Sequence, residues 1–159
     1  MDWYTDEIIR DYIDSICEIL KIDSFDIGVG YSADIGAFAT PTEMAHYNFK
    51  ENYILFNENY LVDLENTLPY IVFTIAHELR HVWQRNNNWN KTISKHKSSK
   101  YLSIEEYNRQ PEEVDANAFA TIITDAMFGC DWDRIGFLSN TICKDLEKQM
   151  EKIVQWLVA

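Results

Sequence analysis

Apolar residues recur at helical spacing near the start of the chain. Within residues 6–21 they stand four, three and four positions apart, and a turn-like Asp23–Ser24 follows. This spacing places one apolar stripe along a helix, so the sequence predicts an N-terminal helix that buries the stripe. The stripe consists of Ile9, Ile13, Ile16 and Leu20.

The pattern then changes to short stretches that are typical of strands. Residues 25–31 alternate between apolar and other positions, residues 37–40 form a short run before Pro41, and residues 53–56 form another run. Together they predict a small sheet of about three strands, in a mixed or an antiparallel order.

Three further helices are predicted in the second half of the chain. The first begins at a cap formed by Asn66 or Thr67 and runs to about Gln84. The second covers residues 112–127, and the last runs from about residue 139 to residue 157. The order of helix, small sheet and three helices predicts the α+β class.

Composition and charge narrow the classes of function. The 159 residues, 47% of them hydrophobic, fit one domain over residues 1–159. A formal net charge of −12 repels phosphate groups, so we expect no direct binding of nucleic acid or of a membrane. The chain starts with acidic residues and has three widely spaced cysteines, Cys17, Cys130 and Cys143. We therefore expect no signal peptide, free thiols and a cytoplasmic location.

A metal-binding motif lies in the middle of the first of these later helices. His77, Glu78 and His81 form an HExxH sequence. Positions i and i+4 share one helix face, so both imidazoles can reach one ion, while Glu78 stands ready to take a proton from a metal-activated water. The apolar residues 70–76 before it indicate a buried helix, in which unpaired polar groups are costly. The motif predicts a catalytic Zn²⁺ site, and the alternative is a surface cluster with ordinary hydrogen bonds.

A catalytic zinc ion needs a third protein ligand from elsewhere in the chain. Glu113 and Asn117 stand four residues apart on the next predicted helix and share a face. Glu113 would ligate zinc, and Asn117 would accept the outer N–H of a ligand imidazole. His96 and, less favoured, Asp115 are alternative ligands. Glu113 could instead serve only as an acid near a helix N-terminus.

The segments 76–81 and 113–120 resemble the ImmA/IrrE-type gluzincin metallopeptidases and the small minigluzincins. Those families combine HExxH with a downstream E-x-x-A-[N/D]-x-F-A helix, and the resemblance spans roughly residues 67–124. It implies a zincin-like fold, Glu113 as the third ligand and zinc-dependent hydrolysis of peptide bonds in a protein or peptide substrate. Asp115 stands where many relatives carry Glu. No helix-turn-helix accompanies the motifs, so DNA binding is not implied.

Two other interpretations stay open. The chain also resembles the SprT-like zincins, which pair HExxH with a later histidine and would make His96 the third ligand. In the second interpretation, the domain is a zinc-stabilised protein-interaction module that catalyses no reaction. Such a module gains nothing from Glu78. For stabilising a reaction oxyanion, Tyr101, Tyr107 and His96 are candidates of equal standing.

Two features bear on partners. Residues 80–109 carry seven basic and two acidic side chains, a net charge of +5. The segment 85–100 is either a solvated loop or a docking site for an acidic partner or substrate. The zincin resemblance further implies that a substrate backbone pairs with an exposed strand edge, for which residues 36–40 and 53–57 are candidates.

Overall fold

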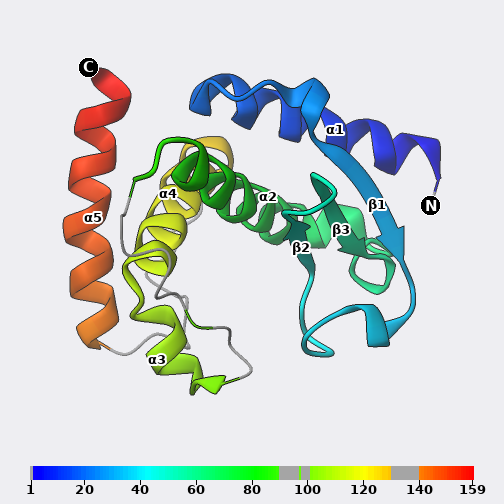
Figure 1. Cartoon of the computed structure of the whole chain (residues 1–159). Coiled ribbons are helices and arrows are strands. Elements are labelled where there is room, and N and C mark those ends of the chain that lie inside the picture. The colour runs from blue at the N-terminus through cyan, green and yellow to red at the C-terminus, as the bar shows by residue number, and fades with distance from the viewer. Residues whose placement is uncertain (1, 90–96, 98–100, 130–139) are drawn as a thin grey trace.

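A long helix, α2 (Leu64–Asn86), runs through the centre of the molecule. The sheet and α1 (Trp3–Leu20) contact it on one side, and α4 (Pro111–Phe128) contacts it on the other, with α5 (Asn140–Val158) packed on α4 (Figure 1). The computed structural model describes residues 2–89, 97, 101–129 and 140–159. The mixed α+β class is confirmed.

Helix α1 buries the apolar stripe that its spacing predicts. Its four stripe residues are at most 2% exposed. The Asp2 side chain accepts the Thr5 N–H at 2.9 Å and starts the helix, and Lys21 ends it in a left-handed conformation. The helix therefore begins three residues before the predicted start, because the Asp2 cap lies outside the apolar pattern.

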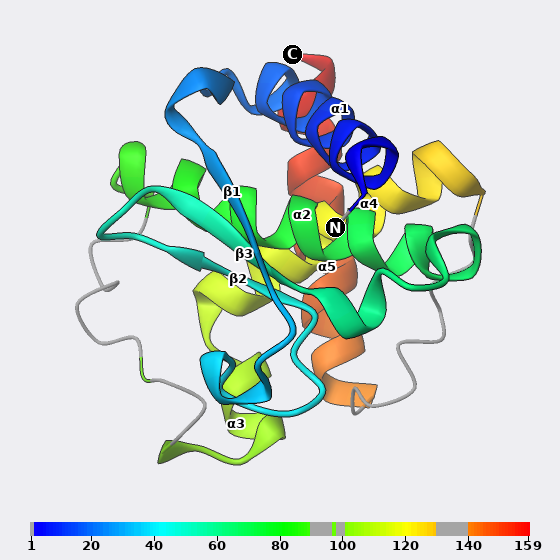
Figure 2. The same cartoon turned by 90° about the vertical axis from the view of Figure 1, so that its right-hand side faces the viewer.

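The sheet is mixed and has three strands, β1 (Gly28–Ser32), β2 (Ala45–Asn48) and β3 (Tyr53–Asn57). Their order is β1-β3-β2, with β1 parallel to β3 and β2 antiparallel to it (Figure 2). The predicted strand at residues 37–40 is wrong. There the Asp34 carboxylate accepts the Gly36 N–H and the Glu43 carboxylate accepts the Ala39 N–H, so local side chains satisfy the backbone in a turn.

The strand order also corrects the expected substrate edge. Residues 53–57 form the central strand, which pairs on both sides, and residues 36–40 form no strand. The open edges belong to β1 and β2. Asn57 N–H donates to the Met44 carbonyl at 2.8 Å, and antiparallel pairs alternate, so Tyr47 turns its N–H away from β3.

Helices α2 and α4 form the core layer that carries the predicted motifs. Helix α2 begins at Leu64, after Asp63, which is earlier than the predicted cap at Asn66 or Thr67. On α4, Ala116, Ala118 and Ala120 are small and fully buried, which lets neighbouring elements approach this helix closely. A short helix that the pattern did not predict, α3 (Ile104–Asn108), starts at a Ser103–Glu106 capping box before α4.

Within the described ranges, no helix combines the length and the apolar content needed to cross a bilayer.

Candidate metal centre

The structure brings together three of the residues that the two motifs single out. His77 and His81 lie one turn apart on α2, and Glu113 faces them from α4. One donor atom from each lies within 4.8 Å of the other two. The Glu113 side chain is 1% exposed, and the two imidazoles are 16% and 15% exposed. The cluster is thus largely shielded, with its histidines open on one side.

The spacing of these donor atoms fits one small ion. The Nε2 atoms of His77 and His81 are 3.0 Å apart, and each lies 3.4 Å from an oxygen of Glu113. Ligand atoms about 2.0–2.2 Å from a tetrahedral zinc ion stand roughly 3.3–3.6 Å from one another. Two of the three separations fall in that range, and the third is a few tenths of an ångström shorter.

The outer nitrogens of both imidazoles are held by side-chain amides. His77 Nδ1 lies 2.9 Å from Asn117 Oδ1, and His81 Nδ1 lies 2.9 Å from Gln84 Oε1. A proton on each Nδ1 leaves the Nε2 lone pair directed at the cluster, which is the arrangement that a metal ion requires. Asn117 lies where the sequence predicts a partner for a ligand imidazole, whereas the role of Gln84 was not predicted.

A buried ion pair fixes the orientation of Gln84. The Gln84 amide nitrogen donates to Asp115 Oδ2 at 2.8 Å and to the Glu112 carbonyl at 2.9 Å, so its oxygen must face His81. Asp115 in turn accepts from Arg80 at 2.8 and 3.1 Å and from Gln149 of α5 at 2.8 Å. Asp115 is therefore engaged on both oxygens and lies outside the ligand cluster.

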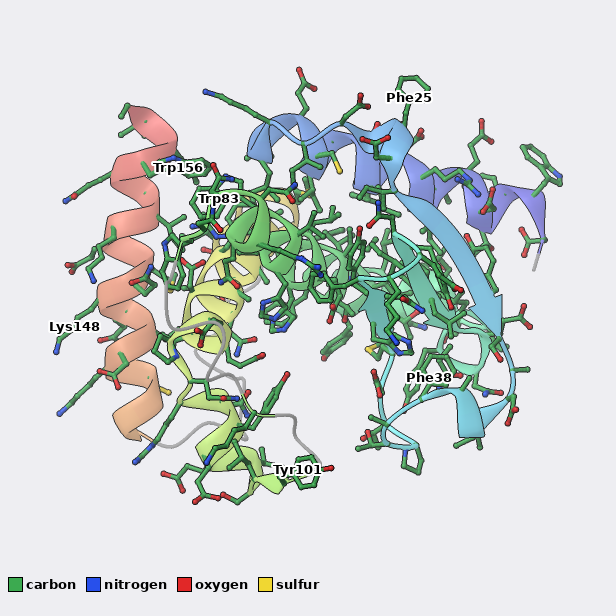
Figure 3. All side chains as sticks on the ribbon, in the orientation of Figure 1. Phe25, Phe38, Trp83, Tyr101, Lys148 and Trp156 are labelled. Atoms are coloured by element: carbon green, nitrogen blue, oxygen red, sulfur yellow. The ribbon has the colours of Figure 1, made fainter. Side chains whose placement is uncertain are left out.

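Aromatic rings enclose the Arg80 guanidinium. It lies 3.8 Å from the centre of the Trp83 ring, 5.1 Å from that of Phe119 and 5.2 Å from that of Trp156. Trp83 and Trp156 meet edge to face between α2 and α5 (Figure 3). These contacts hold the cation where it pairs with Asp115. This network was not predicted, because its one signal in the sequence is a pair of opposite charges, Arg80 and Asp115, on two otherwise buried helix faces.

The cluster opens into a cavity of about 580 Å³ between α2, α4, α3 and the sheet. Glu78 lines it, and the Tyr47 N–H of strand β2 donates to Glu78 Oε2 at 3.1 Å. In the described part of the chain the other oxygen, Oε1, takes no hydrogen bond. Glu78 is thus fixed at one oxygen beside the cluster, with the second oxygen available to a small molecule in the cavity.

Of the candidates for an oxyanion donor, Tyr107 lines this cavity. Burial, the charge of Glu113 and a hydrogen bond with Glu113 raise the pKa of the Tyr107 hydroxyl, which stays protonated. Tyr101 is 75% exposed and does not line the cavity. His96 lies outside the described residues, as does most of the basic segment 85–100.

A histidine–carboxylate pair that was not predicted also lines the cavity, with His46 on β2 and Glu43 just before that strand. His46 Nδ1 lies 3.1 Å from Glu43 Oε1. The hydrogen bond with Glu43 raises the pKa of His46. Burial alone would raise the pKa of Glu43, but the bond with His46 and backbone N–H groups lower it overall. The pair is thus biased toward an imidazolium and a carboxylate.

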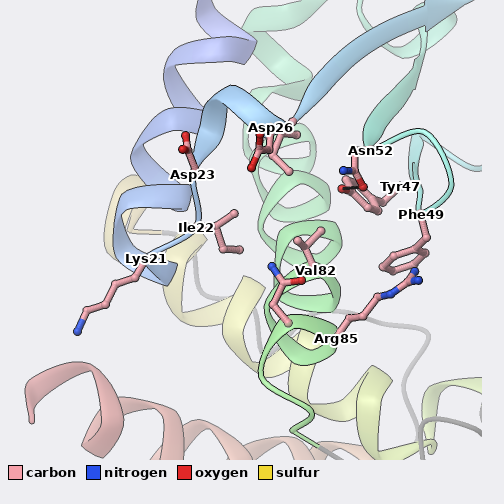
Figure 4. A pocket seen from close by; sticks show the side chains of 11 residues that line it. Lys21, Ile22, Asp23, Asp26, Tyr47, Phe49, Asn52, Val82 and Arg85 are labelled. Atoms are coloured by element: carbon pink, nitrogen blue, oxygen red, sulfur yellow. Dashed lines mark hydrogen bonds between the residues drawn. The ribbon is translucent and has the colours of Figure 1, made fainter.

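A smaller cavity of about 360 Å³ shares two lining residues with the first, Phe49 and Arg85. The Arg85 guanidinium lies 4.9 Å from the centre of the Phe49 ring and forms the border between the two spaces. Figure 4 shows Asp23 and Asp26 on the opposite wall. Among the described residues, the one group with the makings of a metal site is the cluster on α2 and α4.

Comparison with models of known protein families, with curated proteins and with solved structures finds no match to this chain. The resemblance to the ImmA/IrrE-type gluzincins therefore stays a prediction that rests on the two motifs. What the structure adds is their spatial relation: segments 32 residues apart in sequence, from His81 to Glu113, supply one compact set of metal-binding atoms.

Proposed function

We propose that this protein is a zinc-dependent metallopeptidase that hydrolyses peptide bonds of a protein or peptide substrate. The observation that carries the proposal is the meeting of three donor atoms from His77, His81 and Glu113. Two of these residues, His81 and Glu113, line one cavity together with a further carboxylate, Glu78. Two imidazoles and one carboxylate are a ligand set that catalytic zinc sites use, and harder ions such as Mg²⁺ and Ca²⁺ favour all-oxygen sets. In this site zinc would lower the pKa of a water molecule and polarise the scissile carbonyl.

Glu78 performs the proton transfers in the proposed reaction. Its Oε2 accepts the Tyr47 N–H, which orients the carboxylate, and Oε1 takes the proton of the attacking water. The same carboxyl group then gives that proton to the departing amine, so it ends each cycle ionised. A carboxylate fixed by a backbone N–H needs little reorganisation for this role.

The open edge of β2 offers the substrate a place beside Glu78. The strand has one hydrogen-bonded neighbour, β3, and its other edge faces Glu78 through Tyr47. An extended substrate can add main-chain hydrogen bonds along such an edge. This placement replaces the two edges that the sequence suggested. A cytoplasmic protein or peptide is the substrate class that we propose.

The test compares wild type with Glu78→Gln, using a library of quenched fluorescent peptides and measuring bound zinc in the same samples. We expect zinc-dependent cleavage by wild type, and a loss of about 10²–10⁴-fold in Glu78→Gln with zinc content unchanged, because an amide cannot accept the proton. Equal cleavage by the two proteins would refute the role of Glu78. Zinc binding without any cleavage across the library would favour the non-catalytic module.

A further inference from the structure

Hydrolysis of a peptide bond puts negative charge on the former carbonyl oxygen, and donors directed at that oxygen lower the barrier. Four side chains that line the large cavity carry N–H or O–H donors besides the clustered His81, namely His46, Gln84, Arg85 and Tyr107. The contacts of each decide which one can serve.

Two of these donors are committed to hydrogen bonds elsewhere, and a third is held at the border with the second cavity. Gln84 gives both amide hydrogens to Asp115 and the Glu112 carbonyl. Tyr107 bonds to Glu113, a member of the donor cluster. Arg85 stacks on Phe49 at the border with the second cavity.

His46 is placed differently. It precedes Tyr47, whose N–H holds Glu78, so its backbone lies next to the proposed base. Side chains alternate along a strand, and here Tyr47 lines the second cavity whereas His46 lines the first. The Nδ1 atom is bound to Glu43, and the Phe38 ring packs edge-on at 5.7 Å between centroids. One ring nitrogen is therefore anchored, and within the described residues Nε2 has no protein partner.

We propose that His46, anchored by Glu43, donates a hydrogen bond from Nε2 to the oxygen that becomes negatively charged in the hydrolysis, which makes it a further catalytic residue. The inference rests on the proposed function. As the water oxygen bonds to the carbonyl carbon, Glu78 takes the proton and the carbonyl π electrons move onto the oxygen. His46 stabilises that charge and keeps its own proton. When the C–N bond breaks, the electrons return and the proton passes from Glu78 to the amine.

The charge of Glu43 suits this role. A carboxylate on Nδ1 favours the imidazolium, and the raised pKa of His46 agrees with that preference. An imidazolium is a stronger donor to an anion than a neutral ring. Glu43 itself acts through His46 and is a positioning residue.

The experiment measures two inhibitors on zinc-loaded protein by calorimetry, alongside zinc content and thermal melting. One is a phosphinic dipeptide, whose tetrahedral anionic group mimics the reaction oxyanion, and the other is the matching peptide hydroxamate. The variants are His46→Phe, which keeps a ring but removes the donor, His46→Gln, which restores a neutral donor, and Tyr107→Phe, which removes the rival hydroxyl. Glu43→Gln tests the anchor.

We expect His46→Phe to lose about 10²-fold in phosphinate affinity, while hydroxamate affinity and zinc content stay near wild type. His46→Gln recovers part of the loss, and Glu43→Gln shows a smaller selective loss. The inference is overturned if His46→Phe binds phosphinate like wild type, if it loses both inhibitors equally, or if the selective loss appears in Tyr107→Phe instead. Wild-type protein that binds zinc but neither inhibitor overturns the proposed function together with the inference. The three outcomes above overturn the inference alone, so the two failures can be told apart.

Discussion

The Nε2 atoms of His77 and His81 face each other at 3.0 Å. Each ring has its Nδ1 at an amide oxygen, and the orientation of the Gln84 amide is set by Asp115 and the Glu112 carbonyl. With a proton on each Nδ1, two neutral rings would direct lone pairs at one another. A proton or a metal ion between them removes that repulsion, and the adjacent carboxylate of Glu113 attracts either cation.

Zinc should stabilise the folded protein. An ion bound only by the folded state adds about 4 kcal/mol when free zinc is about 1,000 times Kd. For a chain of this length that corresponds to roughly 8–16 °C in Tm. We expect a chelator to lower the Tm of wild type by this order, and to leave the Tm of His77→Ala almost unchanged. Calorimetric melts with and without chelator check this, and an equal shift in both proteins would contradict it.

Zinc affinity should depend more on the ligand Glu113 than on the two side-chain amides that hold the imidazoles. Glu113→Ala removes a ligand and is expected to release zinc in a competitive chelator titration. Asn117→Ala and Gln84→Ala keep all three ligands but loosen the imidazoles, so each should weaken binding by about 10–100-fold. Thr121→Ala is the matched control, because Thr121 lies one turn beyond Asn117 and its hydroxyl donates to the Asn117 backbone carbonyl, not to the cluster. If Asn117→Ala binds zinc as tightly as this control, the Asn117 amide does not contribute to zinc binding.

Asp115 should matter for folding more than for ligation. It is fully buried and pairs with Arg80, which is 3% exposed. Asp115→Ala leaves an uncompensated buried cation and should lower the free energy of unfolding by about 3–5 kcal/mol. Replacing both partners, with Arg80→Met and Asp115→Leu, should recover much of that loss. Urea unfolding of wild type and these two variants measures the difference, and an Asp115→Ala protein as stable as wild type would contradict the account.

Zinc binding should release a proton. Burial lowers the pKa of His81, but the hydrogen bond to Glu113 and the charges of Glu113 and Glu78 raise it overall, to about 9 without metal. This raised pKa stabilises the metal-free fold fully below about 6.5, and the contribution is lost as pH rises through about 9. Zinc must displace the proton, so its affinity should rise with pH over the same interval.

Calorimetric titration of zinc at pH 7.5 in buffers of different ionisation enthalpy measures that proton. We expect about one proton to be released per ion bound. A heat of binding that is the same in all buffers would show that His81 is already neutral in the metal-free protein.

The long helices could be predicted from the spacing of their apolar residues, whereas a short strand and the contacts between elements could not. The stripe of α1 and the shared face of His77 and His81 follow from spacing along one helix, because a helix has one repeating geometry. The approach of Glu113 depends on how α4 packs against α2, and its choice as the third ligand rested partly on the resemblance. Strand β2 was missed because its four residues include two polar ones, His46 and Asn48, and its pairing with β3 decides its conformation. The contacts of Gln84 and His46 depend on side chains from other elements, which no local pattern reports.

The most direct test of the central claim is X-ray absorption at the zinc edge, recorded on wild-type protein purified without chelators. The account predicts about one zinc ion per chain, with two imidazole nitrogens and a carboxylate oxygen at about 2.0–2.2 Å, and no zinc above background in His81→Ala. Three imidazoles in wild type would contradict Glu113 and favour His96 as the third ligand. Wild-type protein without zinc above background would contradict the metal centre itself.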